Sequence, residues 1–176
     1  MTGGGKQASL ARHLLCLCVL ATGSGCGGED ARLSPARSTA VAPKSAQLVV
    51  AGRDVSVELA YTDATRSKGL MGRTRMETDS GMLFLFEDEQ PRRFWMRHTL
   101  IGLDIAFLDD AGRVINIEHG RPAVEFPGYR SAAPARFVLE MADGWCAEAG
   151  LEPGDLIEIP AQLRNLAEPT GAVASP

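Results

Sequence analysis

Cysteine is scarce in this sequence, and the positions of its four cysteines argue against a fold built on disulfides. Cys16 and Cys18 lie in an N-terminal segment that we expect to be removed, and Cys146 stands alone in the later part of the chain. Cys26 can pair with Cys146 only if it stays in the chain with a free thiol. We therefore expect residues 47–160 to fold around an apolar core that leaves Cys146 as a buried thiol.

Long apolar runs are also lacking. The run nearest the N-terminus extends only from Leu14 to Ala21, whereas a membrane-spanning helix needs about 20 apolar residues. Lys6 and Arg12 precede this run and small residues follow it, which is the layout of a secretory signal. We therefore predict that residues 1–25 are a signal peptide that is removed on export.

The end of the predicted signal resembles the lipobox of bacterial lipoproteins, with the residues Gly23, Ser24, Gly25 and Cys26. In a lipobox, a diacylglyceryl group is added to the cysteine, which becomes the first residue of the mature protein. The resemblance implies a lipidated Cys26 and an exported protein anchored to a membrane of the cell envelope, facing the periplasm or the exterior. Gly23 departs from the pattern, where an aliphatic residue is usual. An ordinary cut between Ala21 and Gly25 would instead release a soluble periplasmic protein.

Both ends of the remaining chain have a biased composition. Residues 26–46 are rich in Gly, Ala, Ser and Pro without an apolar period, which is typical of a flexible tether. Residues 161–176 have a similar composition, and we expect a disordered tail there. The sequence therefore predicts a single folded domain at residues 47–160.

This domain has little positive charge. Residues 47–160 contain twelve Arg or Lys against nineteen Asp or Glu, a net charge of −7 (12 minus 19). Such a surface repels phosphates on average, so we do not expect a nucleic-acid partner. Recognised catalytic motifs are missing as well, since the chain has no phosphate-binding loop, serine nucleophile elbow or zinc-protease motif.

Short apolar segments separated by turns predict a mainly β fold. Alternation predicts two hairpins, with strands at residues 48–50 and 55–59 and at residues 103–107 and 114–117; further strands are expected at residues 82–86, 137–141 and 156–159. Short helices are expected from about Asp63 to Leu70 and from Asp143, as the N-cap, to Gly150. We therefore predict a mainly β (α+β) domain, a small antiparallel β-barrel or sandwich with two short helices, whose central strand is residues 82–86.

Four short strings along this domain resemble the prokaryotic family called domain of unknown function 192. They are Gly69-Leu70-Met71-Gly72-Arg73, Gly81-Met82-Leu83-Phe84, Phe94-Trp95-Met96-Arg97-His98-Thr99 with Leu103-Asp104 after it, and Val138-Leu139-Glu140. The resemblance implies a compact β-rich fold that is often exported, but no activity, because the family has no established biochemical function. His98 stands where the family usually has Asn, and Gly102 where it usually has Pro.

Two carboxylates are placed in apolar strands. Asp104 and Glu140 are each flanked by apolar residues, so each needs a partner. Together they could act as general acid and general base, because burial moves the pKa values of two carboxyl groups apart. Alternatively, each pairs with an arginine such as Arg73 or Arg97, or with backbone N–H groups, and stabilises the fold.

Arginines are concentrated around one tryptophan. They are Arg73, Arg75, Arg92, Arg93 and Arg97, close in sequence to Trp95. A guanidinium beside an indole face can hold a carboxylate, a sulfate or a sugar, although a lone tryptophan is also a common core residue. The candidate ligand-binding residues are Arg73, Trp95, Arg97, Asp104 and Glu140.

Soft metal ligands are present without a metal-binding spacing. They are Met71, Met76, Met82, Met96, Met141, His98, His119 and Cys146. Methionines in apolar strings fill gaps in a core, and a lone cysteine beside Trp145 is typically inert even if His98 or His119 approaches it through the fold. We therefore expect no metal and no cofactor.

These observations predict a membrane-tethered accessory or ligand-binding module of the cell envelope, for an anionic or carbohydrate ligand. One alternative is an envelope hydrolase that uses Asp104 and Glu140 as a carboxylate pair. Another is a protein-interaction module that uses an uncovered sheet edge.

Overall fold

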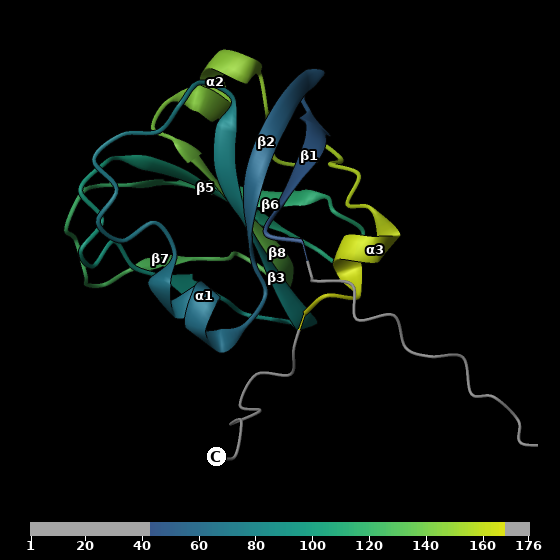
Figure 1. The fold of residues 1–176 in the computed structure, drawn as a ribbon, viewed down its shortest axis with the longest axis horizontal. Coiled ribbons are helices and arrows are strands. Elements are labelled where there is room, and N and C mark those ends of the chain that lie inside the picture. Colours follow the sequence, from purple (N-terminus) through teal and green to yellow (C-terminus); the bar gives the residue numbers. More distant parts are fainter. Residues whose placement is uncertain (1–42, 168–176) are drawn as a thin grey trace, which may run out of the picture. The chain divides into compact units, whose positions relative to one another are not determined.

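A computed structural model describes residues 43–167 of the chain (Figure 1). Its elements, in chain order, are β1 (Ser45–Val50), β2 (Arg53–Ala60), α1 (Asp63–Lys68), β3 (Ser80–Gln90), β4 (Arg93–Phe94), β5 (Leu103–Leu108), β6 (Val114–Gly120), β7 (Tyr129–Arg130), β8 (Ala135–Ala142), α2 (Trp145–Ala149) and α3 (Ala161–Arg164). The signal peptide, Cys26 and most of the predicted tether lie outside the described residues.

Six strands form one sheet in the order β1-β2-β3-β8-β5-β6, and β4 and β7 form a small second sheet. All neighbouring pairs of the large sheet are antiparallel except β2 and β3, which are parallel. No pairing joins β1 to β6, so the sheet is open. The mainly β (α+β) prediction is confirmed in the form of an open, sandwich-like sheet rather than a closed barrel.

The two predicted hairpins are present. Buried and exposed residues alternate from Leu48 to Val50 and from Val55 to Leu59, and a turn at Ala51 and Gly52, both with positive φ, joins the strands. The second hairpin joins β5 to β6, and a β-bulge shifts their register between Phe107 and Leu108. The strand predicted at residues 156–159 is reduced to one bridge, between Arg113 and Leu156.

The parallel pairing of β2 with β3 requires a crossover connection, and α1 lies in it. Thr62 caps α1, since its hydroxyl accepts from the N–H of Thr65 and the Thr65 hydroxyl accepts from the N–H of Thr62. The helix ends at Gly69, which has a positive φ, slightly earlier than predicted. The crossover brings β3 into the interior of the sheet, which confirms the predicted central strand.

The sheet carries an apolar core on each face. Its central strands are buried on both faces, as the uninterrupted burial of β5 shows. One core packs α2 and the 151–163 segment against residues such as Leu83 and Leu139. The other packs the segments around Leu70 and Met96 against Phe84 and Phe107. Successive side chains along β8 therefore point alternately into the two cores.

Three short helices are described, one more than predicted. In Figure 1, α1 and α2 lie at opposite ends of the large sheet. The N-cap of α2 is Gly144, so the expected cap by the Asp143 side chain is wrong. The fold also continues beyond Pro160, because α3 forms and Leu163 is buried in the core. Within residues 43–167, no helix is long and apolar enough to cross a membrane.

Candidate functional site

A pocket of about 490 Å³ lies over β8 and has Glu140 in its lining. Glu140 is opposite Met82 of β3 and Ile105 of β5 in the sheet, so it belongs to the face covered by α1 and the 94–99 segment. The pocket is lined by Asp63, Arg66, Ser67, Lys68, Gly69, Leu70, Met71, Phe84, Phe86, Arg93, Phe94, Trp95, Thr99 and Glu140. A central strand thus supplies a polar group beneath walls contributed by α1, β3 and β4.

The walls of this pocket are largely aromatic. Phe94 packs edge-on against Phe84, with ring centroids 4.9 Å apart, and is held in place by the pairing of β4 with β7. Trp95 follows directly and is 54% exposed, so it is a surface of the pocket and not a core residue. Gly69 closes α1 with a φ of 45°, and a Cβ there would lie 3.3 Å from the Phe84 ring. A glycine at this position lets the chain turn tightly against the aromatic wall.

Glu140 is a buried carboxyl group without a partner. Its side chain is 4% exposed and makes no hydrogen bond or ion pair within the described part of the chain. Its oxygens still reach the pocket, since no fully buried side-chain oxygen of residues 43–167 lacks a hydrogen-bond partner. Burial raises the pKa of Glu140 from 4.5 to about 8, because the charged form loses its hydration. At neutral pH the group therefore keeps its proton and presents to the pocket both an O–H donor and a carbonyl acceptor.

The basic groups at the pocket differ in how they are held. Arg66 donates to the backbone carbonyls of Tyr61 and Leu85, at 2.7 and 3.0 Å, and pairs with Asp63 at 2.6 Å. Lys68 and Arg93 are exposed and form no ion pair with the described residues. The mouth of the pocket is therefore positive, since these two cations add to the balanced Arg66–Asp63 pair.

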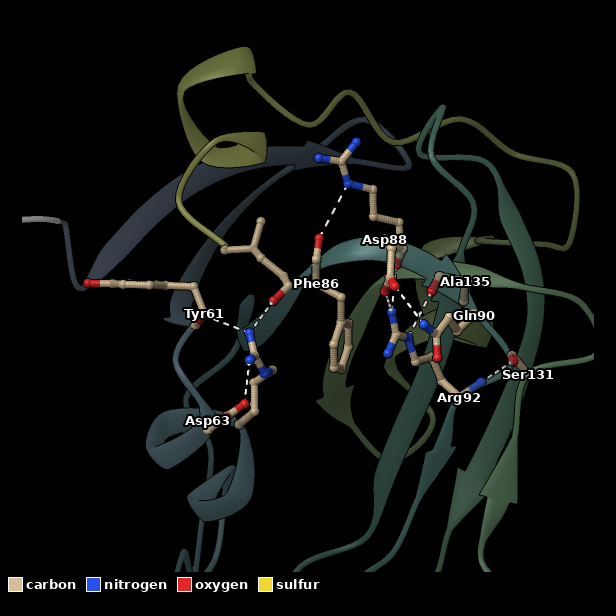
Figure 2. A network of polar contacts seen from close by, with 11 residues as sticks. Tyr61, Asp63, Phe86, Asp88, Gln90, Arg92, Ser131 and Ala135 are labelled. Carbon is tan, nitrogen blue, oxygen red and sulfur yellow. Dashed lines mark hydrogen bonds and ion pairs between the residues drawn. The ribbon is translucent and has the colours of Figure 1, made fainter. Parts of the chain in front are cut away.

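A second arginine fixes the aromatic edge of the pocket. Figure 2 shows Arg92 between Asp88, Ala135 and Ser131, with the Phe86 side chain nearby. The Arg92 guanidinium donates to the Ala135 carbonyl at 3.0 Å and to the Asp88 carboxylate at 2.7 Å, and lies 3.9 Å from the centre of the Phe86 ring. Through these contacts Arg92 orients a pocket wall rather than facing a ligand.

The five candidate residues do not form one cluster. Trp95 and Glu140 line the same pocket. Arg73 pairs with Glu58 at a neighbouring hollow, and Arg97 pairs with Glu125 at 3.2 Å. Neither arginine pairs with Asp104 or Glu140, so the predicted arginine partners are wrong, whereas the predicted backbone N–H partner is found for Asp104.

Asp104 lies on the other face of the sheet. It is opposite Met141, the residue after Glu140, and adjacent residues of a strand point to opposite faces. Its carboxylate contacts His119 Nδ1 at 2.8 Å and accepts from the backbone N–H of Cys146 at 2.8 Å. The sheet therefore lies between Asp104 and Glu140. A carboxylate-pair mechanism would require both carboxyl groups on the same side.

Sequence reasoning named His119 as a possible metal ligand without joining it to Asp104, and it missed Asp143 as a site residue. Asp104, His119 and Asp143 form a group whose ligand atoms all lie within 4.8 Å of one another. Cys146 is close by, and burial, with the negative charge of Asp104, raises the pKa of its thiol to about 12. The thiol therefore stays protonated and is a poor nucleophile.

The fold and pocket define a class: a small α+β domain with an open mixed sheet and an aromatic pocket over a buried carboxyl group. The chain belongs to the family DUF192, described as an uncharacterized ACR, whose model matches residues 46–159. This confirms the family resemblance that the four strings carry.

Two solved structures are similar. One, from Sinorhizobium meliloti 1021, is provisionally described as a transcription regulator; it is 35% identical with a TM-score of 0.59, over 64% of this chain and 89% of that one. The other is a protein of unknown function from Novosphingobium aromaticivorans DSM 12444, 36% identical with a TM-score of 0.59, over 65% of this chain and 84% of that one. No curated protein matches the sequence significantly.

Proposed function

We propose that this protein is a ligand-binding module of the cell envelope whose pocket over Glu140 takes a small acidic carbohydrate. The observation that carries the proposal is the unpartnered, buried Glu140 carboxyl group in the lining of an aromatic pocket. A carboxyl group that opens on a pocket and has no protein partner is free to hydrogen-bond a ligand there.

The chemistry of the pocket favours a sugar ring that carries a negative charge. Trp95 offers an exposed indole face against which the apolar face of a pyranose can stack. Protonated Glu140 can donate to a ring hydroxyl and accept from it. Lys68 and Arg93 at the mouth favour an acidic substituent such as a carboxylate.

The N-terminal pattern supports the envelope location. A lipidated Cys26 would hold the mature protein at a membrane of the envelope. Export can be tested separately, by asking whether labelled palmitate is incorporated into the expressed chain and is lost in Cys26→Ser.

The competing hydrolase is less well supported, because Asp104 and Glu140 lie on opposite faces of the sheet. A pair of carboxyl groups that flanks a glycosidic bond must share one cleft. Glu140 alone can hold and orient a sugar hydroxyl, which is binding rather than turnover.

Binding can be tested by calorimetric titration of the full chain with glucuronate, N-acetylmuramic acid, glucose and N-acetylglucosamine. We expect saturable binding of an acidic sugar and weaker binding of its neutral counterpart. Trp95→Ala should weaken binding by about two- to tenfold, since stacking on an aromatic ring contributes about 0.5–1.5 kcal/mol. Phe126→Ala is the matched control, because Phe126 is an exposed aromatic residue outside the pocket.

A second pair of variants tests the charge at the mouth. Arg93→Ala should weaken binding of the acidic sugar but not of the neutral one, whereas Arg121→Ala, an exposed arginine that does not line the pocket, should change neither. Absence of binding across the panel, or equal affinity in Trp95→Ala and the unmodified chain, would refute the proposed ligand class.

A further inference from the structure

Three metal-ligating side chains converge on the face of the sheet opposite the pocket. Asp104 comes from β5, His119 from β6 and Asp143 from the turn after β8, and their ligand atoms all lie within 4.8 Å of one another. None of them lines the pocket over Glu140. The group is therefore a second candidate site, separate from the proposed sugar pocket.

The strand register explains why these residues meet. Asp104 is directly opposite His119 on one side and Met141 on the other. Asp143, two residues beyond Met141, returns to the same face. Its backbone N–H donates to the carbonyl of Gly102 at 3.1 Å, which continues the register past the end of β8.

Gly102 provides the space that the Asp143 side chain occupies. A Cβ at position 102 would lie 2.9 Å from the Asp143 Cβ, 3.2 Å from its Cγ and 3.1 Å from its Oδ2. Any larger residue would push this carboxylate away. The bare backbone at Gly102 thus lets the Asp143 carboxylate lie over the strand end, beside Asp104.

The charges of this group are not balanced by a permanent cation. The Asp104 side chain is fully buried, and among the described residues its ion-pair partner is His119 alone, which is charged only when protonated. The Asp143 carboxylate makes no ion pair or hydrogen bond within residues 43–167. A buried carboxylate with a second carboxylate beside it is costly unless positive charge compensates it, and a divalent cation supplies that charge.

We propose that Asp104, His119 and Asp143 bind a divalent transition metal ion of the zinc type. One imidazole nitrogen and two carboxylate oxygens are ligands that zinc and manganese accept, and three protein ligands leave a coordination position for water. With metal–ligand bonds of about 2.1 Å, two ligands of a tetrahedral ion lie about 3.4 Å apart. His119, whose side chain is 66% exposed, and Asp143, also exposed, can rotate to close the group to that distance.

The contact between Asp104 and His119 already brings two of the proposed ligands together. Nδ1 of His119 lies 2.8 Å from Asp104 Oδ1, so both atoms face the space in which the ion would lie. The imidazole is therefore already held beside the carboxylate that would share the ion with it.

The test is a titration of the full chain, stripped with EDTA and dialysed, with zinc chloride in a calorimeter and with cobalt(II) in a spectrophotometer. We expect one saturable high-affinity site and, with cobalt, visible absorption bands of a low-symmetry site. Asp143→Asn and His119→Gln should each weaken zinc binding by about tenfold or more, because each removes a direct ligand. Both positions are exposed, so both variants should keep the thermal unfolding midpoint of the ion-free protein.

Asp54→Asn is the matched control, since Asp54 is an exposed aspartate on β2 outside the group. It should bind zinc like the unmodified chain. Absence of saturable binding would overturn the proposal, and so would an affinity that is equal in Asp143→Asn, His119→Gln and the unmodified chain, because the ion would then lie elsewhere. Glu140→Gln should leave zinc affinity unchanged, which separates this result from the outcome of the sugar titrations.

Discussion

Replacing Glu140 by Gln should stabilise the protein, and the gain should depend on pH. Burial raises the pKa of the Glu140 carboxyl from 4.5 to about 8. Between these two values, the unfolded chain ionises while the folded protein keeps the proton. The folded protein then binds more protons than the unfolded chain, so its stability falls as pH rises.

The size of this effect follows from the two pKa values. Relative to pH below 4.5, Glu140 costs the fold about 1.4 kcal/mol for each pH unit between 4.5 and 8, which amounts to about 3 kcal/mol at pH 7. Glutamine has nearly the same shape and does not ionise. The advantage of Glu140→Gln should therefore be small at pH 4.5, grow up to about pH 8 and level off above it.

Urea unfolding at several pH values from 4.5 to 9 measures this difference directly. The comparison should use the difference between the variant and the unmodified chain, because the pH dependence of all other groups then cancels. Glu158→Gln, at an exposed glutamate, serves as the control for the chemical change itself. If the free energy of unfolding changes with pH in the same way for Glu140→Gln and for the unmodified chain, the Glu140 carboxyl is not desolvated and the reasoning is refuted.

Three further changes test the packing described above. Gly81→Ala should destabilise the fold severely, by about 3 kcal/mol or more, because its Cβ would lie 2.5 Å from the backbone oxygen of Glu140 and 2.4 Å from the Met141 sulfur. Gly72→Ala is the control: its Cβ would meet nothing within 4 Å, so it should cost only about 1–2 kcal/mol from the positive φ at this position. Urea unfolding measures both free energies. Leu163→Ala should cost about 2–4 kcal/mol if α3 belongs to the fold, whereas Leu156→Ala, at an exposed position, should cost less than about 1 kcal/mol. The same urea-unfolding assay distinguishes the two variants. Cys146 should react with iodoacetamide at pH 8 far more slowly in the folded protein than in urea, since its thiol is buried and its pKa is raised to about 12. Mass spectrometry measures the two rates, and equal rates would contradict the burial of this thiol.

Local patterns predicted the parts of the fold that depend on local rules. The two hairpins could be recognised because turn residues separated alternating apolar segments. The central strand could be recognised because the run from Met82 to Phe86 offers apolar side chains to both faces. The burial of Asp104 and Glu140 followed from the same reasoning, since both were flanked by apolar residues on each side.

The grouping of Asp104 with His119 depends on one irregularity that no local pattern showed. Continuing the pairing of Leu108 with Val114 along the hairpin would place Asp104 opposite Glu118. The β-bulge shifts the register by one residue, so Asp104 is opposite His119 instead. A shift of one residue moves every side chain to the other face, and His119 would otherwise have pointed away from Asp104.

The pocket could not be predicted, because it depends on long-range pairing. Its lining comes from α1 and the three residues after it, β3, the 93–99 segment and a single residue of β8. β8 supplies that residue only because it inserts between β3 and β5. Proximity in sequence pointed instead to Arg73 and Arg97 as neighbours of Trp95, but their carboxylate partners are Glu58 and Glu125.

The insertion of β8 between β3 and β5 also has a consequence for the folding of the chain. β3 and β5 come before β8 in the sequence, so each has an unpaired edge until residues 135–142 have been added. Before that point the chain can form only two separate pieces, one containing β1 to β3 and the other the β5–β6 hairpin. Contacts between residues so distant in sequence form slowly, and exposed strand edges favour aggregation. A chain truncated before Ala135 should therefore be insoluble rather than partly folded, even though most of its strands are present.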